Sequence, residues 1–208
     1  MKLVCFALKE EAAPFQKIAA GRPDVSILVT GIGRQNAMQS LGRFLAGGAN
    51  APDLVLTCGF AGGLNPGLKP GNVIFWSLDE IFQFKIPAAG AKPAKFFCAD
   101  RIATTVAEKI KLRNETGADA VEMESAAIHA ICVERGIPCA TIRVISDTAN
   151  EDLPLDFNTL AKPDKNLDMG KLLLAIARSP GKIGALMKLQ KKTRFAAEQL
   201  AGVLAKIV

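Results

Sequence analysis

Residues 53–64, DLVLTCGFAGGL, join a nearly continuous apolar run to a group of glycines. Such a run is typical of a strand that is buried on both faces of a sheet. The glycine-rich residues that follow it, 59–63, would let backbone N–H groups converge on an anion or a sugar. A tight turn explains the same residues about as well, because glycine is a preferred turn residue. The stretch therefore predicts a central strand that ends in a ligand-binding loop or in a turn.

Similar apolar runs recur along the chain and alternate with stretches suited to helices. Strands are predicted at 2–8, 25–31, 53–59, 72–81 and 139–147. Helices are predicted at 34–48, 99–112, 124–136, 171–178 and after Ser179-Pro180, with a helix or turn at 10–20. Irregular connections are predicted at 86–95 and 153–166. This alternation predicts one α/β domain with a central mixed, mostly parallel sheet flanked by helices.

The composition is that of an ordinary globular chain. Half of the 208 residues are hydrophobic, which is ample for a core, and no run of 18 apolar residues suggests a membrane span. The apolar start is too short for a signal peptide. The five cysteines are dispersed and form no CxxC pair, which predicts reduced thiols in a cytoplasmic protein. The single histidine, His129, lacks partners at ligand spacing, so we expect it to be structural and expect no metal site.

The net charge of +6 is concentrated at the C-terminal end of the chain. Residues 1–170 are nearly neutral, whereas residues 171–208 hold eight basic residues and one acidic residue, Glu198. The charge is therefore a property of the tail, and no nucleic-acid groove is expected in the domain.

Candidate ligand-binding residues follow the predicted strands, where ligands collect in open α/β sheets. The stretch GIGRQN, 31–36, departs from the dinucleotide fingerprint GxGxxG at Asn36, so a nicotinamide-dependent oxidoreductase is not favoured. The stretch AVEMES, 120–125, places two carboxylates at the start of an apolar helix. They could simply be favourable charges at a helix N-terminus. Met123 between them suggests instead a surface that packs under something flat, with a carboxylate at its rim.

Five stretches together resemble the superfamily of purine nucleoside phosphorylases and methylthioadenosine/S-adenosylhomocysteine nucleosidases. They are ALKEEAAPF, TGIGRQNA, TCGFAGGLNPGLKPGNVI, GADAVEMESAAI and IRVISDTAN, in the family's order over residues 1–150. The resemblance implies a nucleoside phosphorylase-like catalytic domain over residues 1–170, followed by a basic helical segment at 171–208. It also implies a homodimer or larger assembly, a small-molecule nucleoside substrate and no cofactor apart from phosphate as a co-substrate.

The resemblance assigns roles to individual residues. The carboxylate of Glu124 would bind the ribose hydroxyls, Met123 would pack beneath the sugar, and Glu11 would activate an attacking water. Asp147 would pass a proton to N7 of the purine, with Arg143 and Ser146 at that end of the site. That acid must carry a proton near neutral pH, so we expect burial to favour its protonated form. Substrate contacts are also implied for the glycine-rich segment. Its residues are Gly59, Phe60, Ala61 and Gly62.

The chain departs from the family's usual pattern near the nucleophile. Phe60 replaces a serine that holds phosphate or water, and Thr57 stands where phosphorylases place an arginine. The residues therefore lean towards hydrolysis, with Arg34 or loop N–H groups left as alternative phosphate ligands. The family's base-stacking phenylalanine has no clear counterpart. Phe60, Phe96 and Phe97 could supply an aromatic wall, but the usual burial of phenylalanine favours a core role.

The tail resembles the hopanoid-associated phosphorylase branch, whose members are implicated in removing adenine from adenosylhopane. Its lysines and arginine alternate with apolar residues, which is compatible with a helix at an anionic lipid surface, peripheral to the inner membrane. An ordinary solvated helix face is the commoner explanation.

Three alternatives therefore stay open for function. The first is cleavage of adenine from adenosylhopane by phosphate or water, the second is a methylthioadenosine/S-adenosylhomocysteine-type nucleosidase, and the third is a non-catalytic nucleoside-binding or membrane-surface protein. Binding alone would not need an acid at N7, which favours an enzyme.

Overall fold

A mixed sheet forms the centre of the molecule in the computed structural model, which describes residues 1–47, 51–160 and 169–208. Within these residues the sheet has eight strands, and the order along its main path is β2-β1-β3-β8-β4-β5. The strands are β1 (Lys2–Phe6), β2 (Val25–Val29), β3 (Leu54–Gly63), β4 (Val73–Ser77), β5 (Lys92–Pro93), β6 (Phe96–Cys98), β7 (Ala120–Glu122) and β8 (Cys139–Asp147). The predicted α/β class with a mixed sheet is confirmed.

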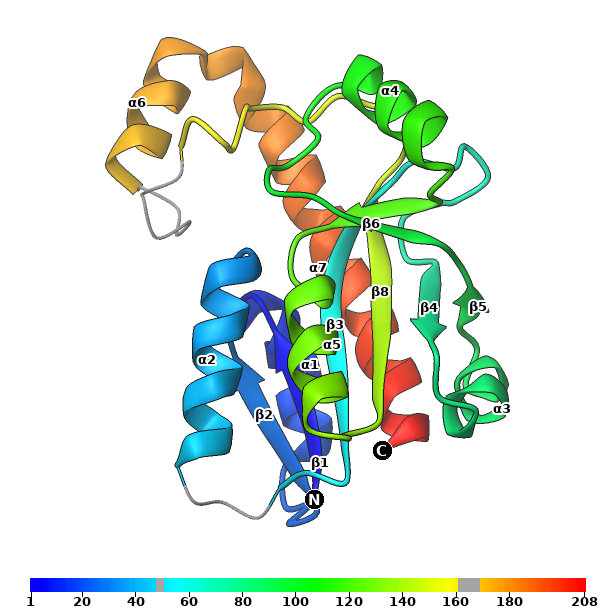
Figure 1. Cartoon of the computed structure of the whole chain (residues 1–208). Helices are drawn as coiled ribbons and strands as arrows, with labels where there is room; N and C mark the ends of the chain where they lie inside the picture. Colours follow the sequence, from blue (N-terminus) through cyan, green and yellow to red (C-terminus); the bar gives the residue numbers. More distant parts are fainter. Residues whose placement is uncertain (48–50, 161–168) are drawn as a thin grey trace.

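Most strand pairs are parallel, and the two antiparallel pairings involve β7 and β4. Strands β2, β1, β3 and β8 run parallel, β7 pairs antiparallel with β3, and β4 pairs antiparallel with β8. Every residue of β8 is buried, as expected for a strand covered on both faces. The carboxyl ends of the parallel strands therefore share one edge of the sheet, at the top of Figure 1.

Helices cover both faces of the sheet (Figure 1). They are α1 (Lys9–Ala19), α2 (Arg34–Ala46), α3 (Ile81–Ala88), α4 (Val106–Thr116), α5 (Ser125–Glu134), α6 (Met169–Arg178) and α7 (Ile183–Ile207). The pair α2 and α5 packs on one face around Leu3, Leu41 and Ile128. The pair α1 and α7 packs on the other face around Phe15 and Leu200. No helix of the described chain is long and apolar enough to cross a membrane.

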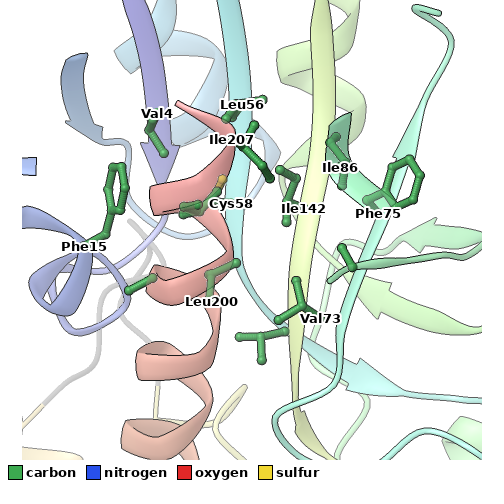
Figure 2. Packing of buried hydrophobic residues seen from close by; sticks show 14 of the residues in the cluster. Val4, Phe15, Leu56, Cys58, Val73, Phe75, Ile86, Ile142, Leu200 and Ile207 are labelled. Carbon is green, nitrogen blue, oxygen red and sulfur yellow. The ribbon is translucent and has the colours of Figure 1, made fainter. Parts of the chain in front are cut away.

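The basic C-terminal segment contributes to the main core. The second half of α7 buries Leu200, Leu204 and Ile207 completely, and Figure 2 shows Leu200 and Ile207 facing strand residues such as Leu56 and Ile142. Complete burial of one such side chain contributes roughly 1.5–3 kcal/mol. The first half of α7 is more exposed, and its Met187 side chain is 57% exposed. Leu200 is one of the apolar tail residues that alternate with basic residues in the segment predicted for a lipid surface, and it is buried in the core instead.

Several predicted boundaries were wrong. The glycine stretch 59–63 is part of β3, because its pairing with β8 continues past Gly59, with a register shift after Ala61. The predicted helix at 99–112 begins only at Val106, because Thr105 accepts the N–H of Glu108 in a capping box.

Other differences lie between residues 72 and 98. The predicted strand 72–81 ends at Ser77, and helix α3 follows it. The predicted connection 86–95 contains the end of α3 and the short strand β5. Part of the connection predicted at 153–166, and Gly48 of the helix predicted at 34–48, lie outside the described residues.

His129 has a structural environment in this fold. Its Nε2 atom lies 2.9 Å from Thr141 Oγ1, and its ring packs edge-on against Trp76. Burial lowers the pKa of the imidazole below its ordinary value, so the ring is neutral near pH 7.

Candidate active site

Five ionisable side chains predicted for the site or flanking it gather along the carboxyl edge of the sheet. Glu11 comes from the first turn of α1, Glu122 from the end of β7 and Glu124 from the N-cap position of α5. Arg143 and Asp147 both come from β8. All five are buried, with at most 6% of each residue exposed.

Arg143 lies at the centre of a group of carboxylates. Its Nη2 atom donates to Glu122 Oε2 at 2.5 Å and lies 3.4 Å from Glu124 Oε2. The same nitrogen donates to Thr57 Oγ1 at 3.2 Å. Thr57 stands where the phosphorylases place an arginine, and here it accepts a hydrogen bond from the Arg143 guanidinium. Arg143 Nε is the one buried side-chain nitrogen or oxygen without a hydrogen-bond partner within the described ranges. A buried donor without an acceptor is costly, so this atom is suited to a polar ligand or water.

Glu122 holds the local structure together. Its Oε2 atom accepts the backbone N–H groups of Glu124 and Ser125, at 3.0 and 2.8 Å. Its Oε1 atom accepts the Ser125 hydroxyl at 2.6 Å. Burial alone would raise the pKa of Glu122, but Arg143 and these hydrogen bonds outweigh it and hold the pKa below its ordinary value. This carboxylate therefore stays ionised and fixes the turn between β7 and α5.

Glu124 faces the start of α2. Its Oε1 atom accepts the Gly33 backbone N–H at 2.7 Å, where a helix N-terminus favours negative charge. Burial, with a contribution from neighbouring Glu122, nevertheless raises the pKa of Glu124 from 4.5 to about 7, against the opposing effect of Arg143. Met123 beside it is 9% exposed. The pair thus presents a carboxyl group that can change charge near neutral pH, next to an apolar side chain.

Glu11 reaches across from α1 to the glycine segment of β3. Its two carboxylate oxygens accept the backbone N–H groups of Leu8 at 2.9 Å and Phe60 at 2.8 Å. Burial raises the pKa of Glu11 above its ordinary value, although these N–H groups and Arg143 oppose the rise. A carboxylate with a raised pKa is a better proton acceptor, as a general base requires.

Gly59 makes the approach of these side chains possible. A Cβ atom at this position would lie 2.7 Å from Glu11 Oε1 and 2.9 Å from Arg143 Nη1. Its φ of +147° is also a conformation that L-residues rarely adopt. The predicted role of the glycine segment in a site is thus given a steric reason, because any side chain at Gly59 would displace the catalytic candidates.

Asp147 occupies a separate position at the end of β8. Its Oδ1 atom accepts the Ser146 hydroxyl at 2.6 Å, and its Oδ2 atom accepts from Lys109 Nζ at 2.6 Å. Burial of this carboxyl agrees with the sequence-based expectation. The ammonium beside it was not foreseen, and the two groups form a buried ion pair.

Lys109 is the functional candidate that sequence reasoning missed. It is completely buried in α4, where most neighbouring residues are exposed or half-buried. The capping box formed by Thr105 and Glu108 was the available signal, because it fixes where the helix begins and hence which face it presents. The ion pair itself joins positions 38 residues apart and has no local signature.

The structure brings most predicted residues together but gives Phe60 a different neighbourhood. Phe60 is half-buried and packs against the core beneath α1 and α7, while its backbone N–H serves Glu11. The carbonyl of Ala61 lies 3.3 Å from the Ser146 hydroxyl, and a Cβ on Gly62 would lie 3.4 Å from an Asp147 carboxylate oxygen. The glycine segment therefore contacts both ends of the site.

The phenylalanines considered from sequence for an aromatic wall pack against apolar clusters instead. Phe96 and Phe97 are half-buried and pack against two small apolar clusters around β7. This agrees with the favoured core role. Arg34, the alternative phosphate ligand, is half-exposed and lies 3.8 Å from Asp100.

A small cavity of about 140 Å³ adjoins the Asp147 end of the site. Its walls come from the segment after β8 and from the first half of α7. The lining residues are Asp147, Glu151, Asp152, Leu153, Pro154, Ala185, Lys188, Leu189 and Lys192. The C-terminal helix therefore borders the site as well as the core. Across the described ranges, no group of three or more His, Cys, Asp or Glu side chains is arranged to hold a metal ion.

Comparisons with known proteins agree with this arrangement. Residues 90–178 match the family model described as the phosphorylase superfamily. A 5′-methylthioadenosine/S-adenosylhomocysteine nucleosidase of Shewanella halifaxensis is 29% identical over a 170-residue alignment that covers 65% of this chain and 73% of the relative. A nucleosidase of the same name from an Exiguobacterium species is 25% identical, with 76% and 82% covered.

Solved structures show the same fold over nearly the whole chain. A 5′-methylthioadenosine/S-adenosylhomocysteine nucleosidase of Neisseria meningitidis, in complex with methylthio-immucillin-A, superposes with a TM-score of 0.74 at 19% identity, covering 99% of this chain and 97% of that one. Futalosine hydrolase of Helicobacter pylori superposes with a TM-score of 0.69 at 18% identity, covering 99% and 96%. By the match over residues 90–178 and the sequence relatives, the chain is similar to the phosphorylase superfamily, and it shares the fold of the solved nucleosidases.

Proposed function

We propose that this protein is an enzyme that cleaves the N-glycosidic bond of a 5′-modified purine nucleoside and releases adenine. The observation that carries the proposal is the placement of buried Glu11, Glu124 and Asp147 along one edge of the sheet. The nucleosidases and the futalosine hydrolase named above support it, since their names describe hydrolysis of nucleosides.

The proposed roles follow from the charges that develop as the bond breaks. The sugar gains oxocarbenium character, which the Glu124 carboxylate favours from the ribose hydroxyls, with Met123 beneath the ring. The base gains negative charge, which a proton from Asp147 at N7 removes. Glu11 accepts a proton from the attacking water, close to the Arg143 guanidinium.

Water rather than phosphate is the proposed nucleophile. Three carboxylates, Glu11, Glu122 and Glu124, surround the single cation of Arg143. Such a site repels a phosphate dianion by its excess of negative charge. Thr57 bonds Arg143, so the usual phosphorylase cation has no replacement at that position. A neutral water meets no such barrier and can accept from the unpartnered Nε of Arg143.

For the 5′ substituent we propose a large apolar group, with adenosylhopane as the substrate to test first. The proposal rests on the resemblance of the tail to the hopanoid-associated branch. The relatives support a 5′-modified nucleoside more generally, because methylthioadenosine and S-adenosylhomocysteine differ at that position.

Adenine release measured by liquid chromatography tests the function. Adenosine, methylthioadenosine and adenosylhopane are each offered with and without phosphate. We expect adenine from adenosylhopane, and a rate that does not depend on phosphate. Adenine from methylthioadenosine alone would replace the hopanoid proposal with the nucleosidase alternative, and a phosphate requirement would overturn hydrolysis. No adenine from any of the three would contradict the proposed release of adenine from these nucleosides.

We also propose a homodimer and a peripheral membrane contact through the first half of α7. Ile183 and Met187 are exposed, and successive residues four apart share one helix face with Lys191. Lys192 is excluded from this surface because it pairs with Glu151. Removal of residues 171–208 would destroy the core, so flotation with anionic liposomes should instead compare the intact chain with Met187→Glu/Lys191→Glu. Equal flotation of both proteins would contradict the membrane contact, and sedimentation tests the dimer.

A further inference from the structure

Lys109 and Asp147 form an ion pair that the proposed roles leave unexplained. The Lys109 side chain is 0% exposed, and its ammonium nitrogen lies 2.6 Å from Asp147 Oδ2. The same nitrogen donates to the carbonyl oxygens of Thr148 at 2.7 Å and Glu151 at 2.9 Å. An ammonium has three N–H donors, so all three are used. A completely buried lysine in a fixed position is unusual and needs a reason.

One carboxylate neutralises this lysine. Glu151 offers its backbone carbonyl to Lys109, while its carboxylate pairs with Lys192 of α7 at 2.5 Å. Lys109 therefore fixes Asp147 in one orientation, and the second Asp147 oxygen is fixed by Ser146. In this ion pair Asp147 is the acceptor of the Lys109 hydrogen bond, and a carboxylate cannot itself protonate a leaving base. The proton must therefore come from elsewhere or arrive with the reaction.

We propose that Lys109 is the positioning residue of Asp147 and the source of the proton that Asp147 passes to the base; this rests on the proposed function. As the bond between C1′ and N9 breaks, its electron pair moves onto the purine. One proton leaves Lys109 Nζ for the carboxylate, and one proton leaves the carboxyl group for N7. Lys109 becomes a neutral amine, Asp147 is again a carboxylate, and the base departs neutral. Lys109 then recovers a proton from solvent as the products leave.

A low-polarity position suits such a relay. The Lys109 side chain is 0% exposed and its ammonium nitrogen lies 2.6 Å from Asp147 Oδ2, so a proton can pass between the two groups without a bridging water. The other charged groups that face the pair are Glu151 and Asp152 from the segment after β8, and Lys188 and Lys192 from α7. Glu151 and Lys192 are paired with each other, which leaves Lys109 as the cation in contact with the acid.

The alternative is a purely structural pair that ties α4 to β8. The two explanations differ in which substrates they affect. A 4-nitrophenyl riboside carrying the same 5′ group loses a stable phenolate and needs no proton on its leaving group. A structural defect slows both substrates, whereas loss of the proton source slows only the purine nucleoside.

The experiment compares Lys109→Met, Lys109→Arg and the control Lys111→Met on both substrates. Lys111 is exposed on the same helix. General acid catalysis is worth about 10²–10⁴-fold, so we expect kcat for the purine nucleoside to fall about a hundredfold in Lys109→Met. The nitrophenyl substrate should change less than about threefold, and the purine activity should move to lower pH, where solvent can protonate Asp147. Lys109→Arg keeps the positive charge, but a guanidinium does not give up its proton. We therefore expect the turnover of the purine nucleoside by this variant to stay low.

Three results would overturn the inference. They are retained purine activity in Lys109→Met, an equal loss on both substrates, and full activity of Lys109→Arg. Thermal denaturation shows which variants are folded, and the two substrates keep the test valid even for a weakened protein. Failure of the proposed function is distinct, because the unmodified enzyme would then release no purine at all.

Discussion

The buried carboxylates at the two ends of the site are paired with cations in different ways. At the Arg143 end, which we propose binds the sugar, three carboxylates share one cation, and burial raises the pKa of both Glu11 and Glu124. At the Asp147 end, which we propose faces the base, the carboxylate has a lysine of its own. With the cation shared, Glu124 can take up a proton near neutral pH, while a dedicated cation fixes the Asp147 carboxylate in position. The comparison predicts that the two ends respond differently to substitution and to pH.

Removal of the shared cation should have the largest effect. Arg143→Met leaves three buried carboxylates without their cation, and breaking a buried pair in this way costs roughly 3–5 kcal/mol. Lys109→Met leaves only one carboxylate without its cation, so it should cost less. Urea unfolding measures both, with the exposed Arg135→Met as the control. An equal loss for Arg143→Met and Lys109→Met would remove the distinction between the two ends.

Loss of the proposed base should reduce activity with little effect on the fold. Glu11→Gln keeps the size of the side chain but cannot accept a proton from water, so kcat should fall about a thousandfold. Its neighbour Glu10, exposed on the same turn, provides the matched control Glu10→Gln. Activity of Glu11→Gln close to that of the control would exclude Glu11 as the base.

The pH dependence of the free energy of unfolding should show the raised pKa of Glu124. Because the pKa of Glu124 rises from 4.5 to about 7, the folded state binds more protons than the unfolded state between these values. Stability should therefore fall as the pH rises from about 4.5 to 7, by on the order of 3 kcal/mol from this group. Glu124→Gln should flatten this part of the profile in chemical unfolding at several pH values. A profile unchanged by the substitution would mean that Glu124 is charged throughout.

A side chain added to the glycine segment at Gly59 should lower the free energy of unfolding by a smaller amount. Gly59→Ala places a Cβ against Glu11 and Arg143 in a strained conformation, which should cost about 1–3 kcal/mol and disturb catalysis. Gly202→Ala in α7 meets no atom within 4 Å and should instead stabilise the helix by roughly 0.5–1 kcal/mol. Thermal denaturation compares the two. A neutral Gly59→Ala would show that the two side chains move apart without cost.

Much of the site was accessible from sequence because its residues lie in short, characteristic stretches. The carboxylates of AVEMES, Asp147 after a buried strand and Glu11 after the first strand were all expected at one sheet edge, and they lie there. Their division of labour was harder to foresee. That Glu122 fixes the turn while Glu124 faces Gly33 depends on a hydrogen bond between positions 91 residues apart.

The sequence alone determined the alternation of strands and helices, the α/β class and the resemblance to the superfamily, since these depend on periodicity and on contiguous motifs. Tertiary structure decided that the glycines continue β3, that α7 closes the core and that Lys109 meets Asp147. Each of these depends on contacts between distant segments, where packing and charge pairing override local preference. Local patterns specify which residues can form a site, and only the packed chain decides which charges share a partner.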